Sequence, residues 1–205
     1  MPLVKEIDID QGVLLLWELT EDLEWLKAQF PLLDKDEAFH ALKNKKRQQE
    51  WLSVKMMLRY IGCPSTQISY NSKGQPQVNH PSYQYISISH SSQLAGIILH
   101  TNKPVGLDIE SLSRNFKTIE RKYLSPTEIM WAHQDNKRHC LFWSAKEAVY
   151  KIAGIPGIHF SDQIVLSPEK NNRLTAQLVT PERNEHFHLN YFEYNEQLIV
   201  FLIAA

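Results

Sequence analysis

The sequence has few of the features that mark secreted, zinc-ribbon or nucleic-acid-coating proteins. Its 205 residues include only two cysteines, Cys63 and Cys140, which lie far apart and in no metal-binding spacing. A disulfide-stapled fold and a zinc ribbon are therefore disfavoured. The 22 lysines and arginines are balanced by 23 aspartates and glutamates. Because a strongly basic domain is thereby excluded, we expect no nucleic-acid partner.

Long hydrophobic runs are also missing. The two longest, VLLLW at 13–17 and LIVFLIAA at 198–205, fall well short of the roughly 20 residues that cross a bilayer. The first twelve residues lack the basic and apolar regions of a signal peptide. We therefore expect a soluble, cytoplasmic protein with no membrane partner. The hydrophobic fraction of 43% is enough for an ordinary globular core.

Hydrophobic spacing predicts a mixed chain without internal repeats. Period-two alternation and short apolar runs predict strands at residues 13–19, 86–90, 95–99, 105–109, 186–194 and 197–203. Helical spacing and end signals predict helices at residues 21–30, 35–61, 116–123, 126–134 and 137–152. Gly62 and Pro64 are expected to stop the second of these, and a capping box of Ser125 and Glu128 to begin the fourth. The composition of residues 71–74 predicts a turn. This order predicts an α+β fold, and its two parts resemble each other in outline. We expect two similar α+β halves, residues 1–102 and 103–205.

The first candidate site is the segment VGLDIE at 105–110. On a strand, Asp108 and Glu110 share one face with Gly106, and the apolar residues share the other. Two carboxylates about 7 Å apart on one strand face suit a hard cation such as Mg²⁺. The alternative is the polar face of an amphipathic edge strand, since D-x-E is common by chance.

The second candidate site is the segment FWSAKEAVYK at 142–151. On a helix, Glu147 and Lys151 lie one turn apart and opposite the apolar side chains of this segment. The alternative is a surface ion pair that adds a few tenths of a kcal/mol to the helix. Trp143 lies near the polar stripe, which is an unusual place for an indole unless something packs on it.

Together the two segments resemble a known family. G-x-D-I-E at 106–110, followed by W-S-x-K-E-x-x-x-K at 143–151, closely resembles the paired motifs of the 4′-phosphopantetheinyl transferase superfamily. The segments ISHS at 88–91, RKYLSPTE at 121–128 and KRQQEWL at 46–52 are similar to further motifs of that family. The length resembles the surfactin-type branch, which implies a monomeric pseudo-dimer within one chain.

The resemblance implies transfer of 4′-phosphopantetheine from coenzyme A to a serine hydroxyl of an apo acyl or peptidyl carrier protein, with release of 3′,5′-ADP. Asp108, Glu110 and Glu147 would hold Mg²⁺, with Mn²⁺ as an alternative. Glu147 would also accept the serine proton, and Lys151 would stabilise the leaving group. In the N-terminal half, the residues expected to bind coenzyme A are Lys46, Arg47, Lys55, Lys73, Ser89 and His90.

The sequence departs from the family pattern in the turn at 74–76. Gln75 stands where the family has a lysine, and Lys73 is the candidate substitute. A catalytically silent module that binds coenzyme A or a carrier protein remains an alternative. The alternative interpretation of the basic block at 43–47 is a solvated helix face that binds no coenzyme. His186 and His188 alternate on an expected strand, and an alternative interpretation is that they form a pair of metal ligands.

Overall fold

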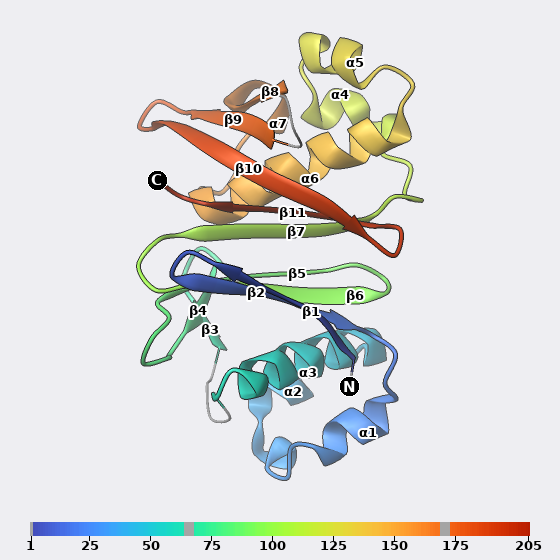
Figure 1. Cartoon of the computed structure of the whole chain (residues 1–205), viewed down its shortest axis with the longest axis vertical. Helices are drawn as coiled ribbons and strands as arrows, with labels where there is room; N and C mark the ends of the chain where they lie inside the picture. Colours follow the sequence, from blue (N-terminus) through green and yellow to red (C-terminus); the bar gives the residue numbers. More distant parts are fainter. Residues whose placement is uncertain (1, 64–67, 169–172) are drawn as a thin grey trace.

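The structure, a computed structural model, describes residues 2–63, 68–168 and 173–205 (Figure 1). Its strands form two antiparallel sheets and a small hairpin, which confirms the α+β class. The first sheet has the order β1-β2-β6-β5, formed by β1 (Leu3–Ile9), β2 (Gly12–Glu18), β6 (Leu94–His100) and β5 (Tyr85–His90). The second has the order β7-β11-β10-β9-β8, formed by β7 (Val105–Ser111), β11 (Gln197–Ile203), β10 (Asn184–Tyr194), β9 (Arg173–Val179) and β8 (Ile164–Pro168). The hairpin consists of β3 (Ile68–Tyr70) and β4 (Pro76–Val78).

Helices cover the outer face of each sheet. The first part of the chain supplies α1 (Leu23–Ala28), α2 (Glu37–His40) and α3 (Lys45–Tyr60). The second supplies α4 (Glu120–Tyr123), α5 (Pro126–Ala132), α6 (Asn136–Ala153) and α7 (Phe160–Gln163). Two 3₁₀ turns, Leu33–Lys35 and Lys117–Ile119, precede α2 and α4. None of the helices in the described ranges is long and apolar enough to span a membrane.

The core is layered because the strands at its centre are apolar on both faces. On β2, Leu15 and Trp17 pack toward α3, whereas Leu14 and Leu16 pack against the second sheet. On β11 the same alternation sends Val200 toward α6 and its neighbours toward the first sheet. The order of layers is therefore α3, first sheet, second sheet and α6 (Figure 1).

The edge strands of the two sheets, β5 and β7, are joined by serine side chains. Backbone N–H groups of β7 that have no strand partner donate to β5 hydroxyls: Leu107 to Ser87 Oγ over 3.0 Å, and Ile109 to Ser89 Oγ over 3.1 Å. Buried N–H groups need such acceptors. The serines satisfy this need and are small enough to let the edges approach. This junction holds the centre of β7, where Asp108 lies.

The structure corrects parts of the predicted outline. The single helix expected over 35–61 is wrong at its start, because the chain breaks at 41–44 and Asn44 caps α3 by accepting from the Lys46 N–H over 2.8 Å. Strands β1, β8 and β9 were not expected. The turn before Gln75 is confirmed, as is the Ser125 capping box of α5. Pro64, expected to stop α3, lies outside the described residues.

Candidate active site

Asp108 projects from the middle of β7 toward α6. Its neighbours Leu107 and Ile109 point the other way, into the core between the sheets, as the alternation predicts. Gly106 makes the approach of α6 possible, since a Cβ there would lie 2.3 Å from the carbonyl oxygen of Ala148. Glycine at this position therefore brings the two sequence motifs side by side.

Lys151, near the end of α6, lies directly on Asp108. Its Nζ donates to Asp108 Oδ1 over 2.9 Å, to the Leu107 carbonyl over 2.7 Å and to Ser89 Oγ over 3.0 Å. Ser89 Oγ also donates to Asp108 Oδ1 over 3.1 Å. The second oxygen of this carboxylate, Oδ2, is buried without a hydrogen-bond partner among the described residues. One oxygen of Asp108 thus remains open to a ligand.

Glu147 stands one turn before Lys151 and is half-buried. Burial, followed by the nearby negative charge of Asp108, raises the pKa of Glu147 from 4.5 to about 7, although the Lys151 charge opposes this. At neutral pH such a carboxyl exchanges its proton readily. A group with a pKa near the working pH is well suited to act as a general base.

Glu110 is held by two side chains through one oxygen. Its Oε1 accepts from Arg114 over 2.6 Å and from Trp143 Nε1 over 3.0 Å. The Trp143 indole stacks on Phe116 with ring centroids 5.4 Å apart. Burial and the charge of Asp108 raise the pKa of Glu110, and the Arg114 charge opposes them. The unusual position of Trp143 is explained, because it packs on one ring and orients a carboxylate.

The chemistry of the three acidic side chains fits a divalent cation, but they do not form a finished site. Asp108 has a buried oxygen without a hydrogen-bond partner among the described residues, and burial, followed by the charge of Asp108, raises the pKa of both Glu110 and Glu147. Hard oxygen ligands of this kind suit Mg²⁺. In the part of the chain that the structure describes, however, no group of three or more acidic, histidine or cysteine side chains is placed to hold a metal ion.

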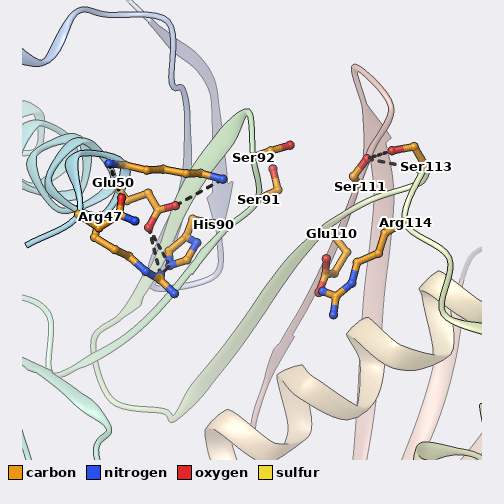
Figure 2. Close-up of a pocket in the computed structure, with 11 residues that line it drawn as sticks. Arg47, Glu50, His90, Ser91, Ser92, Glu110, Ser111, Ser113 and Arg114 are labelled. Atoms are coloured by element: carbon orange, nitrogen blue, oxygen red, sulfur yellow. Dashed lines mark hydrogen bonds and ion pairs between the residues drawn. The ribbon is translucent and has the colours of Figure 1, made fainter. Parts of the chain in front are cut away.

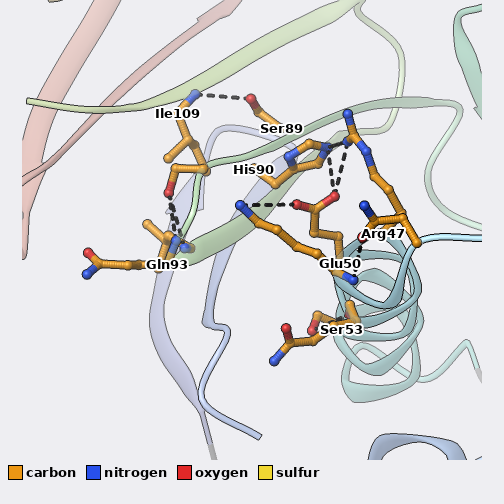
Figure 3. Close-up of polar contacts among 12 residues, drawn as sticks. Arg47, Glu50, Ser53, Ser89, His90, Gln93 and Ile109 are labelled. Atoms are coloured by element: carbon orange, nitrogen blue, oxygen red, sulfur yellow. Dashed lines mark hydrogen bonds and ion pairs between the residues drawn. The ribbon is translucent and has the colours of Figure 1, made fainter. Parts of the chain in front are cut away.

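A polar cleft of about 480 Å³ lies between Glu110 and α3 (Figure 2). On the α3 side, Glu50 is 5% exposed and accepts from Arg47 over 3.1 Å. The same Arg47 nitrogen lies 2.6 Å from His90 Nε2 (Figure 3). Burial lowers the pKa of His90; the negative charge of Glu50 opposes this shift, and the Arg47 charge acts in the same direction as burial. A neutral His90 can therefore accept a hydrogen bond from Arg47. Lys46 lines the same wall.

A second cleft of about 520 Å³ lies on the other side of His90, and the turn between β3 and β4 borders it. Lys73 and Lys151 both line this cleft. Gln75 also lines this cleft, and its Nε2 donates to the Lys151 carbonyl of α6 over 2.8 Å. The side chain that stands in place of the family lysine is therefore tied to the end of α6, whereas Lys73 is exposed on the turn.

Two predicted coenzyme contacts are placed differently. Lys55 does not line the cleft with Arg47. Its Nζ lies 4.5 Å from the centroid of the Trp51 ring, and Trp51 packs on Phe39 of α2, on another face of α3. Ser89 is 6% exposed and bonded to Asp108, Lys151 and Ile109, so it organises the site from within. His186 and His188 are exposed on β10 and belong to no metal-binding group among the described residues.

Sequence reasoning missed two charged residues of the first cleft. Arg114 was not recognised because it lies in the loop after β7, where no periodic pattern assigns a face. Glu50 was missed because an acidic residue beside basic ones looks like an ordinary helix-surface residue. The Lys46–Glu50 and Arg47–Glu50 spacings of four and three residues are the only local signal.

Lys146 is a buried structural residue and not part of the cleft. Its Nζ donates to Glu128 Oε2 over 2.7 Å and to the Phe160 carbonyl over 2.8 Å. Glu128 also accepts from the Leu166 N–H over 2.8 Å. The pair therefore fastens α5, α7 and β8 to α6, which fixes the rotation of the helix that carries Glu147.

Comparisons with known proteins point to one family. Residues 104–202 match the family model described as the 4′-phosphopantetheinyl transferase superfamily. A 4′-phosphopantetheinyl transferase AcpT of Escherichia coli O157:H7 is 25% identical over 115 residues, which cover 53% of this chain and 59% of that protein. Thermotoga maritima holo-[acyl-carrier-protein] synthase matches at 12% identity and a TM-score of 0.37, over 49% of this chain and 61% of that one. The match thus spans about six-tenths of each relative. With the motifs at Asp108 and Glu147 inside the matched region, residues 104–202 of this chain belong to the 4′-phosphopantetheinyl transferase superfamily.

Proposed function

We propose that the protein transfers the 4′-phosphopantetheine group of coenzyme A to a serine hydroxyl of an apo acyl or peptidyl carrier protein. The observation that carries this proposal is the ion pair of Asp108 with Lys151, near enough to Glu147 for both charges to affect its pKa. Lys151 lines the second cleft, and Glu110 of the same motif faces Arg47 and Lys46 across the first. Phosphoryl transfer needs positioning and charge neutralisation more than covalent catalysis. These side chains supply both.

The reaction assigned to these residues is a displacement at phosphorus. The serine oxygen of the carrier attacks the phosphorus that bears the pantetheine arm, and the bridging P–O bond of the pyrophosphate breaks. The serine proton passes to the Glu147 carboxylate, and 3′,5′-ADP leaves. Lys151 lines the second cleft, and the positive charge of its ammonium group would stabilise the charge that develops on the leaving oxygen.

Asp108, Glu110 and Glu147 would hold the divalent cation, Mg²⁺ or Mn²⁺. When bound, such an ion neutralises the pyrophosphate charge. Ser89 and Lys151 keep Asp108 oriented by bonding to Oδ1, which leaves Oδ2 free. Trp143 orients Glu110 in the same way. The role of these neighbours is to fix the carboxylates before the substrate arrives.

Coenzyme A would lie across both clefts, which share His90. Arg47 and Lys46 would contact the 3′-phosphate, and Lys73 and His90 the rest of the nucleotide and pyrophosphate. The Arg47 side chain is 58% exposed, and it would exchange its contacts with Glu50 and His90 for contacts with an anion. Lys55 is not assigned a phosphate contact, because it faces Trp51.

The two halves, residues 1–102 and 103–205, would work as a monomer. Within one chain, α3 and β5 supply Arg47 and His90, while β7 and α6 supply Asp108 and Glu147. A cleft between two packed units is a common place for a small-ligand site. One chain therefore holds every residue that the proposed reaction uses.

Release of 3′,5′-ADP tests the proposal. Purified protein is incubated with coenzyme A and Mg²⁺, with and without an apo carrier protein, and nucleotides are separated by liquid chromatography. The proposal predicts 3′,5′-ADP only when carrier and cation are both present. Coenzyme A binding without any release would instead favour the catalytically silent module.

A further inference from the structure

We infer that Arg114 is an exchangeable counterion of Glu110: it holds this carboxylate while the cation site is empty and yields it to a divalent cation. The inference rests on the proposed function, since it assumes a cation at these carboxylates. It concerns a residue outside the sequence motifs. Figure 2 shows Arg114 reaching back from its loop to Glu110, across the cleft from Arg47.

The Arg114 side chain is placed to compete for a ligand oxygen. Its nitrogen lies 2.6 Å from Glu110 Oε1, and the guanidinium lies 4.6 Å from the Phe116 ring centroid. The Glu110 side chain is 15% exposed, whereas that of Arg114 is 50% exposed. The Glu110 carboxylate is therefore fixed and mostly buried, and the Arg114 guanidinium that neutralises it lies on the solvent side.

The backbone that carries Arg114 is anchored, so exchange needs only a side-chain rotation. Asn136 Nδ2 donates to the Leu112 carbonyl over 2.8 Å and to the Arg114 carbonyl over 3.1 Å. The Arg114 N–H donates to the Ser111 carbonyl over 3.1 Å. Since Arg114 also lines the first cleft, its guanidinium would remain at the wall of that cleft after release.

Arg114 and a divalent cation would compete for the same carboxylate, because Glu110 Oε1 accepts from Arg114 over 2.6 Å. A cation that binds Glu110 must first break the Arg114 ion pair. Ion pairs with an exposed partner are weak, and the loss of this one corresponds to roughly a two- to tenfold change in binding. Arg114 thus lowers cation affinity without blocking the site.

Direct binding of Mn²⁺, followed by the EPR signal of the free ion, tests the inference without any turnover. The wild type is compared at pH 8.5 with Arg114→Gln and with Arg138→Gln as a matched control. Arg138 is 58% exposed at its side chain and pairs with Asp135 at the start of α6, away from the carboxylates. We expect Arg114→Gln to bind Mn²⁺ roughly two- to tenfold more tightly, and Arg138→Gln to bind like the wild type.

A second comparison assigns the gain to Glu110. In a Glu110→Gln background, Arg114→Gln should have no further effect on Mn²⁺ affinity, because the competed ligand is gone. Unchanged or weaker binding by Arg114→Gln, with a wild type that binds Mn²⁺, would refute the counterion role and leave the proposed function standing. If neither the wild type nor Arg114→Gln binds Mn²⁺, both the counterion and the cation site of the proposed function are wrong.

Discussion

Replacing Glu147 by glutamine should abolish transfer and, at the same time, make the protein more stable at alkaline pH. Burial and the charge of Asp108 raise the pKa of Glu147 from 4.5 to about 7, so folding opposes its ionisation. The native state therefore holds this proton more tightly than the unfolded chain does. Its free energy of unfolding decreases as the pH rises from 4.5 to 7 and stays lowered above 7. Glutamine mimics the protonated form at every pH.

The magnitude follows from the two pKa values. A pKa change from 4.5 to about 7 corresponds to about 3.4 kcal/mol. Because Glu147 is only half-buried and water relaxes around it, we expect a gain of about 1–2 kcal/mol at pH 8. For a chain of this size that raises Tm by roughly 3–6 °C. At pH 5, linkage leaves only about a quarter of the gain.

Urea unfolding at pH 8 and pH 5 without divalent cations measures this effect. The exposed Glu182→Gln is the matched control and should leave stability unchanged at both pH values. Should Glu147→Gln be no more stable than the wild type at pH 8, or equally stabilised at both pH values, the burial of an uncompensated carboxylate at this position is refuted.

Three further outcomes follow from the geometry. Lys151→Ala should lower kcat roughly 10²-fold in a folded protein. Lys146→Ala should instead lower the free energy of unfolding by about 3–5 kcal/mol, because it breaks a buried ion pair. Equal losses of kcat in folded samples of the two variants would contradict the assignment of Lys151 to the leaving group. Arg47→Ala should reduce the preference for coenzyme A over dephospho-coenzyme A, measured as the ratio of their KM values, roughly tenfold. Lys55→Ala is the control and should leave this ratio unchanged. If Arg47→Ala also leaves it unchanged, Arg47 does not contact the 3′-phosphate. Mixing Arg47→Ala and Glu147→Ala proteins should give no more activity than the Arg47→Ala protein alone, and a gain above that level would show that the site is shared between chains.

Local periodicity explains which parts of the site could be predicted. Alternation along β7 places Asp108 and Glu110 on one face, and helical spacing places Lys151 over Glu147. Both assignments depend only on near neighbours in the sequence. The capping box at Ser125 is local in the same sense, because the residues that satisfy it lie three positions apart.

The remaining parts depend on contacts between distant segments. That Ser89 bonds to the edge of β7 follows from how two sheets meet, which no single strand pattern specifies. Lys55 and Arg47 occupy one helix, but packing of Trp51 on α2 decides which of them faces the cleft. Arg114 lies in a loop, where sequence spacing does not indicate direction.

Intact-mass analysis of a carrier protein tests the central proposal most directly. Apo carrier is incubated with coenzyme A, Mg²⁺ and the purified protein, in parallel with a carrier whose acceptor serine is replaced by alanine. The wild type is expected to add the mass of one phosphopantetheinyl group to the apo carrier alone, and Asp108→Asn is expected to add none. A wild type that binds coenzyme A but leaves the mass of every apo carrier unchanged would contradict the assignment of this site as a transferase.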